Sequence, residues 1–362
     1  MLLEHKYLSS RIIAGRACLG RPIADLLEQM QPDKLFALID EAVMSAHEDL
    51  LRPLLAKIPT IRQKIWVIDE SRKNLQSCLE IWQWLEGERA SRHSLLINIG
   101  GGVLTDLGGF AASVFKRGMR TINVPTSLMG MVDAAIGGKT GIDWLGLKNI
   151  IGSFHQAEVV AVDPGFLSSL PPREVLSGYV ELVKHSLLQT KAEWDNCRGR
   201  DPLLLNDSLY DLIEQSARFK ANLIAQDPQE GGLRKVLNLG HTIGHAVESL
   251  ALESDSLPSL THGEAVLIGL IAETYISHRR YGFPSDELQS LVYFAREYYS
   301  PFPLRCNMYK RIVDFAMNDK KNRGNGISFV ALRAIGEYVI DAPLSESDIR
   351  EGLDFYRESS GF

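Results

Sequence analysis

The chain has 362 residues, of which 45% are hydrophobic and 23% are charged, and its formal net charge at pH 7 is −6. A chain of this length and composition can bury one or two sizeable cores, so we expect a globular protein. Charges of both signs are interspersed along the chain, which excludes the basic surface that nucleic acid or an anionic membrane would require. The composition therefore favours a small molecule as the main partner.

The N-terminus and the cysteines indicate the compartment. The opening segment MLLEHKYLSS lacks the basic-then-apolar pattern of a secretory signal, and no apolar run reaches the roughly 18 residues of a transmembrane helix. The four cysteines lie far apart and form no CxxC pair. Scattered cysteines in a long chain are typical of a reducing compartment, so we expect a cytoplasmic protein.

The first half of the chain alternates short apolar runs with helical patterns. The apolar runs are residues 35–40, 64–69, 94–100, 121–125 and 159–163. Strands that alternate with helices predict a parallel sheet covered by helices on both faces. Ligands of such sheets bind at the carboxyl ends of the strands.

Helical periodicity dominates after about residue 171. Pro171 and Pro172 precede the first of these helices and mark a natural boundary. One late strand pair, ISFVAL and EYVIDA, comes before a last helix, for which Ser345 and Asp348 predict a capping box. We predict an α/β N-terminal domain over residues 1–170 and a mainly α-helical C-terminal domain over residues 171–362.

The segment INIGGGVLTDLGGF (97–110) predicts a strand, a glycine turn and a helix. Bare glycine backbone can approach a pyrophosphate, and the N-terminus of a helix favours its negative charge. The dinucleotide fingerprint GxGxxG is incomplete, because Thr105 occupies its last glycine position. A tight structural turn is the alternative interpretation. Asp40 and Asp69 close earlier strands, where an acid can hold a ribose hydroxyl.

The segment VDAAIGGKTGID (132–143) ends like a phosphate-binding loop. Asp133 stands where a Walker motif needs glycine, which excludes an ATPase of that class. Lys139 in a glycine-rich turn still suits a phosphate or a carboxylate, and Lys148 and Asn149 add a cation and an amide nearby. Solvated lysines are the alternative.

Histidines cluster in the second half of the chain. His241 and His245 are four residues apart in LNLGHTIGHAVES, so they share one side of a predicted helix, and His262 in THGEA precedes the next helix. This spacing suits zinc, although the glutamate of HExxH is absent. A lone buried histidine is usually structural. The spacing alone predicts a metal site of His241, His245 and one of His262 or Glu264.

Glu181 and Lys184 are three residues apart in GYVELVKHSLL. They form either a weak surface ion pair or a metal-binding glutamate beside a substrate-binding lysine. Several cations are candidates for the pocket of an anionic substrate, because arginine and lysine suit carboxylates and phosphates. They are Lys139, Lys148, Lys184, Lys220, Arg234 and Lys320.

The order and spacing of these motifs resemble those of the 3-dehydroquinate synthase family within the sugar-phosphate cyclases. The resemblance runs from about Leu35 to about Gly336 and rests on GGGVLTDLGGFAA, FKRG, VPTSL, VDAAIGGKTGI, LKNIIGSF, LPPRE, GYVELVKHSL, LNLGHTIGHAVE, THGEAV and NDKKN. It implies a Rossmann-like N-terminal domain that binds NAD and a helical C-terminal domain that binds a divalent metal. The metal would be zinc, with cobalt as the alternative, and the protein would be a homodimer.

The resemblance also implies a substrate and a reaction. 3-Deoxy-D-arabino-heptulosonate 7-phosphate would become 3-dehydroquinate and phosphate. The steps would be transient oxidation by NAD, phosphate elimination, reduction and an intramolecular aldol closure. In this family the metal ligands match Glu181, His241 and His262. His245 matches a residue near the phosphate that assists proton transfer, and Glu264 would be no ligand.

Further site residues follow from the resemblance alone. Cofactor contacts match Asp40, Glu70, Lys73, Gly101, Gly102, Val103, Thr105, Asp106, Thr126, Ser127, Lys139, Lys148, Phe166 and Ser169. The substrate hydroxyls match Asp133, Lys184 and Asn238, and its carboxylate matches Lys220 and Arg234. The phosphate matches Asn149, His245 and Lys320 or Lys321, while Arg117 would reach the partner subunit's phosphate site.

Some departures keep other functions open. Thr105 stands where many synthases have glycine, and Asp143 stands where they usually have asparagine. A threonine at the first position resembles the pattern of cyclases that act on sedoheptulose 7-phosphate. That sugar has no carboxylate, so Lys220 and Arg234 favour dehydroquinate synthase over the sister enzyme. An NAD- and metal-dependent polyol dehydrogenase would not need the cations, and a non-catalytic regulator would not need His245.

Overall fold

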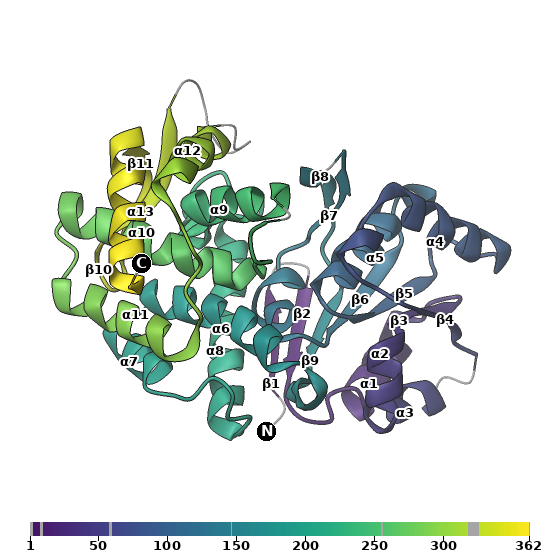
Figure 1. Cartoon of the computed structure of the whole chain (residues 1–362). Helices are drawn as coiled ribbons and strands as arrows, with labels where there is room; N and C mark the ends of the chain where they lie inside the picture. The colour runs from purple at the N-terminus through teal and green to yellow at the C-terminus, as the bar shows by residue number, and fades with distance from the viewer. Residues whose placement is uncertain are drawn as a thin grey trace. The chain divides into compact units, whose positions relative to one another are not determined.

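The computed structural model describes residues 3–7, 10–57, 60–145, 147–254, 256–317 and 326–361. The chain divides into two compact units (Figure 1). The first unit is Met1–Val175 with Leu205–Gln229, and the second is Leu176–Leu204 with Glu230–Phe362. The assignment of NAD to residues 1–170 and of metal and substrate to residues 171–362 stays a prediction.

A seven-stranded sheet forms the centre of the first unit, in the order β1-β2-β9-β6-β5-β3-β4. All neighbouring pairs are parallel except β1 with β2. Each apolar run predicted as a strand corresponds to a strand of this sheet, although the strand of the run 64–69 already ends at Trp66. The strands β1 and β2 add an edge that the periodicity did not predict. The strands are β1 (Leu3–Tyr7), β2 (Ser10–Ala14), β3 (Leu35–Asp40), β4 (Arg62–Trp66), β5 (Leu95–Gly100), β6 (Arg120–Pro125) and β9 (Val159–Val162).

Helices α4 and α5 pack together beside β5 and β6 (Figure 1). Every residue of β5 is buried, as expected for a strand inside a parallel sheet. In α5, Gly108 allows a close approach to β5, since a Cβ there would lie 2.1 Å from Asn98 Oδ1. The helices of this unit are α1 (Arg21–Met30), α2 (Glu41–Ala46), α3 (Glu48–Lys57), α4 (Leu75–Gly87), α5 (Gly102–Val114) and α8 (Asp207–Gln226).

A two-stranded hairpin and four short turns complete the first unit. The hairpin pairs β7 (Lys139–Trp144) with β8 (Leu147–Phe154) in antiparallel fashion. The turns are η1 (Glu70–Arg72), η2 (Phe115–Arg117), the π-helical η3 (Gly130–Ala134) and η4 (Pro164–Ser169).

The second unit is mainly helical, as predicted. Helix α10 is its central element, because α9, α11, α13 and β10 all pack against it. The late strand pair and the capping box of Ser345 with Asp348 are confirmed. The elements are α6 (Pro172–Leu187), whose first turn belongs to the first unit, α7 (Lys191–Arg198), η5 (Leu233–Asn238), α9 (His241–Glu253), α10 (His262–Tyr281), α11 (Ser285–Tyr298), η6 (Cys306–Met308), α12 (Tyr309–Met317), β10 (Ile327–Ala334), β11 (Glu337–Leu344) and α13 (Glu346–Ser360).

Within the described parts of the chain, none of the helices has both the length and the apolar character that a bilayer crossing needs.

The contact between α9 and α10 depends on glycine. A Cβ on Gly269 would lie 1.9 Å from Gly240 O and 2.6 Å from Gly244 N. We expect Gly269→Ala to lower the free energy of unfolding by about 1–3 kcal/mol, because the two helices must separate. Urea unfolding of both proteins measures this difference.

Gly87→Ala is the control for that substitution, since nothing lies within 4 Å of a Cβ at Gly87. It should leave the stability unchanged or slightly raised. Equal stability of the Gly269 and Gly87 variants would contradict the close packing of α9 on α10.

Candidate metal centre and nucleotide-binding edge

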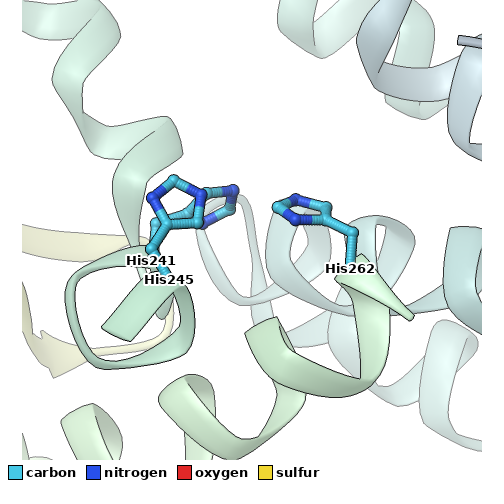
Figure 2. Close-up of side chains that lie close together, drawn as sticks. All are labelled: His241, His245 and His262. Atoms are coloured by element: carbon cyan, nitrogen blue, oxygen red, sulfur yellow. The ribbon is translucent and has the colours of Figure 1, made fainter. Parts of the chain in front are cut away.

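Three histidine side chains converge in the second unit. His241 and His245 lie one turn apart on α9, and His262 is the first residue of α10 (Figure 2). The ring centroids are 5.1 Å apart for His241 and His245, 5.5 Å for His241 and His262, and 5.6 Å for His245 and His262. One nitrogen from each ring lies within 4.8 Å of the others, which is close enough to hold one metal ion.

Two of these rings are oriented through Nδ1. His241 Nδ1 lies 3.1 Å from Leu239 O, and His262 Nδ1 lies 3.2 Å from Glu248 Oε2. Metal-binding histidines typically use their second nitrogen in this way, which fixes the orientation of the ring. Glu248 was missed in the sequence, although its position seven residues after His241 on the same helix was the available signal.

Glu181 on α6 lies beside this cluster. Its side chain is fully buried, and its Oε1 lies 3.7 Å from His241 Nε2. Lys184 forms an ion pair with Oε2 one turn later, but neither carboxylate oxygen accepts a hydrogen bond within the described structure. The Lys184 ammonium compensates the charge of this buried carboxylate on the Oε2 side, while Oε1 faces the ring of His241. The donor set of one carboxylate and two or three imidazoles therefore fits a divalent metal such as zinc.

The first turn of α10 positions His262. Thr261 caps the helix through its side chain, which accepts a hydrogen bond from Glu264 N at 3.2 Å, while Glu264 Oε2 accepts one from Thr261 N at 2.8 Å. This capping box engages the Glu264 carboxylate at the helix start.

The other predicted site residues of the second unit are Arg234 and Asn238 on η5, Lys184 on α6, and Lys320 and Lys321. Arg234 on η5 is only 2% exposed, and Asn238 donates a hydrogen bond to Glu230 Oε1 at 3.0 Å. Lys184 is 1% exposed. Lys320 and Lys321 lie outside the described residues, so their predicted phosphate contacts stay predictions.

The carboxyl ends of β3, β5 and β6 carry the predicted nucleotide contacts of the first unit. Asp40 ends β3 and caps α2, where its Oδ1 accepts a hydrogen bond from Ala42 N at 3.0 Å. Burial raises the pKa of Asp40. After β5, Gly101 and Gly102 start α5, and Val103 lies in its first turn. Thr126 N donates to Gly100 O at 3.0 Å, and a Cβ on Gly101 would lie 3.5 Å from Ser127 Oγ, so the turn lies against the loop that follows β6.

Charged pairs support this edge of the sheet. Lys73 Nζ donates to Asp106 Oδ2 at 2.6 Å, and Lys148 Nζ lies 3.2 Å from Glu70 Oε1. Burial raises the pKa of Asp106, while the Lys73 ammonium acts in the opposite direction. The structure thus brings together four residues that were predicted from the resemblance.

Removal of the Lys73 charge tests this pair. We expect Lys73→Met to lower the free energy of unfolding by about 3 kcal/mol near pH 7, because it leaves the Asp106 carboxylate buried without its partner. The pKa of Asp106 would rise further above its unfolded value, so the native state would bind the extra proton. Stability is then recovered as the pH falls through that pKa, and the deficit relative to the parent protein shrinks.

The double variant Lys73→Met with Asp106→Asn is the control, since it removes both charges. Its stability should return towards that of the parent protein and lose this pH dependence. A deficit that is the same in both variants at every pH would show that the ion pair is not its cause.

Thr105 uses its hydroxyl inside its own helix. The side chain is 1% exposed, and Oγ1 donates to Gly102 O at 3.0 Å. Asp143 likewise has a local partner, because its Oδ1 accepts a hydrogen bond from Asn149 N at 2.8 Å. Both residues that depart from the family pattern therefore have local hydrogen-bond partners.

Lys220 and Asp133 form a close pair within the first unit. Lys220 on α8 donates to the main-chain oxygen and to Oδ1 of Asp133, both at 2.7 Å. Two of the residues predicted to contact the substrate therefore form an ion pair with each other. Lys139 at the start of β7 and Arg117 in η2 are exposed, and Arg117 has a positive φ of 69°.

His47 was missed in the sequence. Its Nε2 lies 2.5 Å from Ser169 Oγ, and its ring meets that of Phe166 edge-on at 5.2 Å. Burial lowers the pKa of His47. His47 therefore supports η4, which carries Phe166 and Ser169, the two predicted cofactor contacts of that turn. No motif marked it, and its position shortly after β3 was the only signal.

Comparisons with known proteins agree with these observations. The family of 3-dehydroquinate synthase N-terminal domains matches residues 65–177, and that of the C-terminal domains matches residues 178–322. The 3-dehydroquinate synthase of Parabacteroides distasonis is 42% identical over 343 residues, which cover 94% of this chain and 96% of the relative. That of Leptospira interrogans is 34% identical over 350 residues, which cover 96% of this chain and 94% of the relative.

Solved structures of related enzymes share the fold. The 2-epi-5-epi-valiolone synthase ValA of Streptomyces hygroscopicus is 25% identical, with a TM-score of 0.84 and 99% of each chain covered. An NADH-dependent butanol dehydrogenase of Thermotoga maritima is 14% identical, with a TM-score of 0.68 and coverage of 97% of this chain and 98% of that one. The two family matches and the curated relatives together show that the chain belongs to the 3-dehydroquinate synthase family.

Proposed function

We propose that this protein is a 3-dehydroquinate synthase, which converts 3-deoxy-D-arabino-heptulosonate 7-phosphate to 3-dehydroquinate and phosphate. It is then a carbon–oxygen lyase of the shikimate pathway. The observation that carries this proposal is the 42% identity, over nearly the whole chain, to a curated enzyme of that name. The buried Glu181 beside His241 supports it, because a family member that had lost its metal would not need that carboxylate.

NAD and a divalent metal are the proposed cofactors, with zinc first and cobalt as the alternative. The structure of ValA contains NAD⁺ and Zn²⁺, which supports both. Bound NAD supplies reversible hydride transfer, and the metal polarises substrate oxygens. Glu181, His241 and His262 would hold the metal ion. The turn that starts at Gly101 would bind the pyrophosphate at the N-terminus of α5.

The chain's own residues have proposed roles in binding and proton transfer. Lys220 and Arg234 bind the substrate carboxylate, and Asp133, Lys184 and Asn238 bind its hydroxyls. Asn149, His245 and Lys320 or Lys321 bind the phosphate, and His245 moves a proton at that group. The Asp133 contact holds the Lys220 ammonium in a fixed orientation, so the lysine loses little freedom when it binds an anion.

Turnover of two sugar phosphates separates this function from that of a sister cyclase. We expect 3-deoxy-D-arabino-heptulosonate 7-phosphate to be preferred strongly, because sedoheptulose 7-phosphate has no carboxylate for Lys220 and Arg234. The ratio of kcat/KM for the two substrates is the measurement. A preference for sedoheptulose 7-phosphate would contradict the proposed function.

A homodimer in the cytoplasm is the proposed assembly. The hairpin β7–β8 exposes large apolar side chains, which are typical of interaction surfaces, and all four cysteines are free thiols. Ser153 on this hairpin donates to Ser113 on α5, four residues before Arg117. A second copy that covers the hairpin would therefore also lie near Arg117, which is the arginine proposed to reach the partner's site.

Light scattering of the purified protein tests the dimer. We expect the mass of two chains, and we expect Leu145→Asp with Leu147→Asp to give single chains, because both side chains are at least 60% exposed on the hairpin. A monomeric parent protein, or a double variant that remains dimeric, would contradict this surface as the interface.

A further inference from the structure

A partly open cavity of about 190 Å³ lies in the second unit, and its lining does not include the three clustered histidines. One face of α10 forms its floor, with Leu267, Ile268 and Ile271, and α11 contributes Val292 and Ala295. All five side chains are more than nine-tenths buried. An apolar protein cavity of roughly 150 Å³ can bind benzene, so the volume here has room for a small ring, which can enter from the exposed side near Ser300.

The polar groups of the cavity wall favour a ligand that donates a hydrogen bond. Glu264 contributes a carboxylate, and Tyr299 and Tyr356 contribute hydroxyl groups. The Tyr299 hydroxyl already donates to Leu176 O at 2.8 Å, and the Tyr356 oxygen accepts from Phe302 N at 2.9 Å. Burial and the charge of Glu264 raise the pKa of Tyr299, so its phenol stays neutral. Arg296 also lines the cavity, but its side chain is exposed, where water screens its charge.

We propose that this cavity is a second ligand site, which binds a small, mostly apolar ring compound with one hydrogen-bond donor. The apolar walls provide most of the affinity, and Glu264 provides the polar anchor. An anionic ligand is disfavoured, because its charge would lie against the Glu264 carboxylate in an apolar surrounding.

The cavity is connected to the histidine cluster through the start of α10. Glu264, Leu267, Ile268 and Ile271 follow the helical spacing of one face, whereas His262 lies about 200° around the axis from Glu264. Glu264 also closes the capping box that begins this helix, by accepting from Thr261 N. A donor that binds the Glu264 carboxylate draws negative charge away from the oxygen that accepts from Thr261 N, so it weakens that capping hydrogen bond. Occupancy of the cavity therefore loosens the turn that carries His262.

Indole is the probe for this site, because its ring N–H can donate a hydrogen bond. 1-Methylindole is the control compound, since a methyl group replaces that hydrogen. We expect saturable binding of indole by NMR titration of the full-length protein. 1-Methylindole should bind about fivefold more weakly, because it cannot donate to Glu264. Failure of indole to bind up to its solubility limit, or equal binding of the two compounds, would overturn the proposed ligand class.

Two variants locate the binding. Ala295→Phe places a ring inside the cavity and should weaken indole binding about tenfold or more, without lowering the melting temperature. Gln289→Phe places the same ring on the exposed side of α11 and should leave binding unchanged. If both variants bind indole like the parent protein, the site lies elsewhere.

Zinc affinity tests the connection to His262 and rests on the proposed metal site. Competition with a chromophoric chelator should give an affinity about fivefold lower in the presence of saturating indole, and an unchanged value with 1-methylindole. An unchanged affinity with indole bound would overturn the connection. If the parent protein binds no zinc, the proposed function fails, whereas the indole titration still decides the cavity site.

Discussion

Glu181→Gln should bind zinc about 100-fold or more weakly than the parent protein, and should lose activity with it. Partners that only orient a metal ligand already contribute 10–100-fold to affinity, so loss of a ligand should cost at least the upper figure. The substitution keeps the shape of the side chain and removes its charge. Zinc affinity by chelator competition is the measurement, because it does not depend on turnover.

The same substitution should destabilise the fold. Lys184 is 1% exposed and forms an ion pair with Glu181, so its ammonium would remain buried without a counter-charge. Breaking a buried pair in this way costs about 3–5 kcal/mol. The effect on zinc binding must therefore be separated from an effect on folding.

The double variant Glu181→Gln with Lys184→Met provides that separation, because it removes both buried charges. It should recover most of the stability and still fail to bind zinc. Zinc binding at parental affinity in this folded double variant would remove Glu181 from the ligand set.

His245→Asn should keep one zinc per chain and lose about 10²-fold or more in kcat, since in the proposed function His245 transfers a proton and is not a ligand. His241→Asn should lose the zinc itself. The two histidines lie on the same helix with ring centroids 5.1 Å apart, so the pair is matched in location and in substitution. Metal content by mass spectrometry and phosphate release by each variant are the measurements.

This comparison separates the ligand set that the geometry groups from the set that the resemblance implies. His241, His245 and His262 can approach one ion together, and Glu181 with His241 and His262 is the set that the resemblance implies. If His245→Asn loses zinc as fully as His241→Asn does, the three-histidine set holds the metal.

The pattern of the sequence predicted the sheet well, because buried parallel strands appear as apolar runs that end in turns. It missed β1 and β2, which form a short antiparallel pair at the sheet edge where this signal is weak. It also did not predict that α8 packs with the first unit, since local periodicity carries no information on which core a helix covers.

Candidate site residues were harder to assign from local spacing. Three histidines could be grouped because two share a helix face. Glu181 and Lys184 could not be distinguished from a surface pair until their burial was known, and burial depends on elements distant in the sequence. Lys220 and Asp133 are 87 positions apart in the sequence, so no local spacing pattern predicts their contact. His47 was not predicted either, because its contact partner Ser169 lies 122 positions away in the sequence.

This chain is best described as a redox-neutral, metal-dependent cyclase. Phosphate release from 3-deoxy-D-arabino-heptulosonate 7-phosphate, with NAD and zinc and with or without EDTA, tests it most directly, with the NADH absorbance followed throughout. We expect release that EDTA abolishes and no accumulation of NADH, because the cofactor is reduced and reoxidised within each turnover. Absence of release, or steady accumulation of NADH on a polyol substrate, would contradict the claim and indicate a dehydrogenase of the same fold.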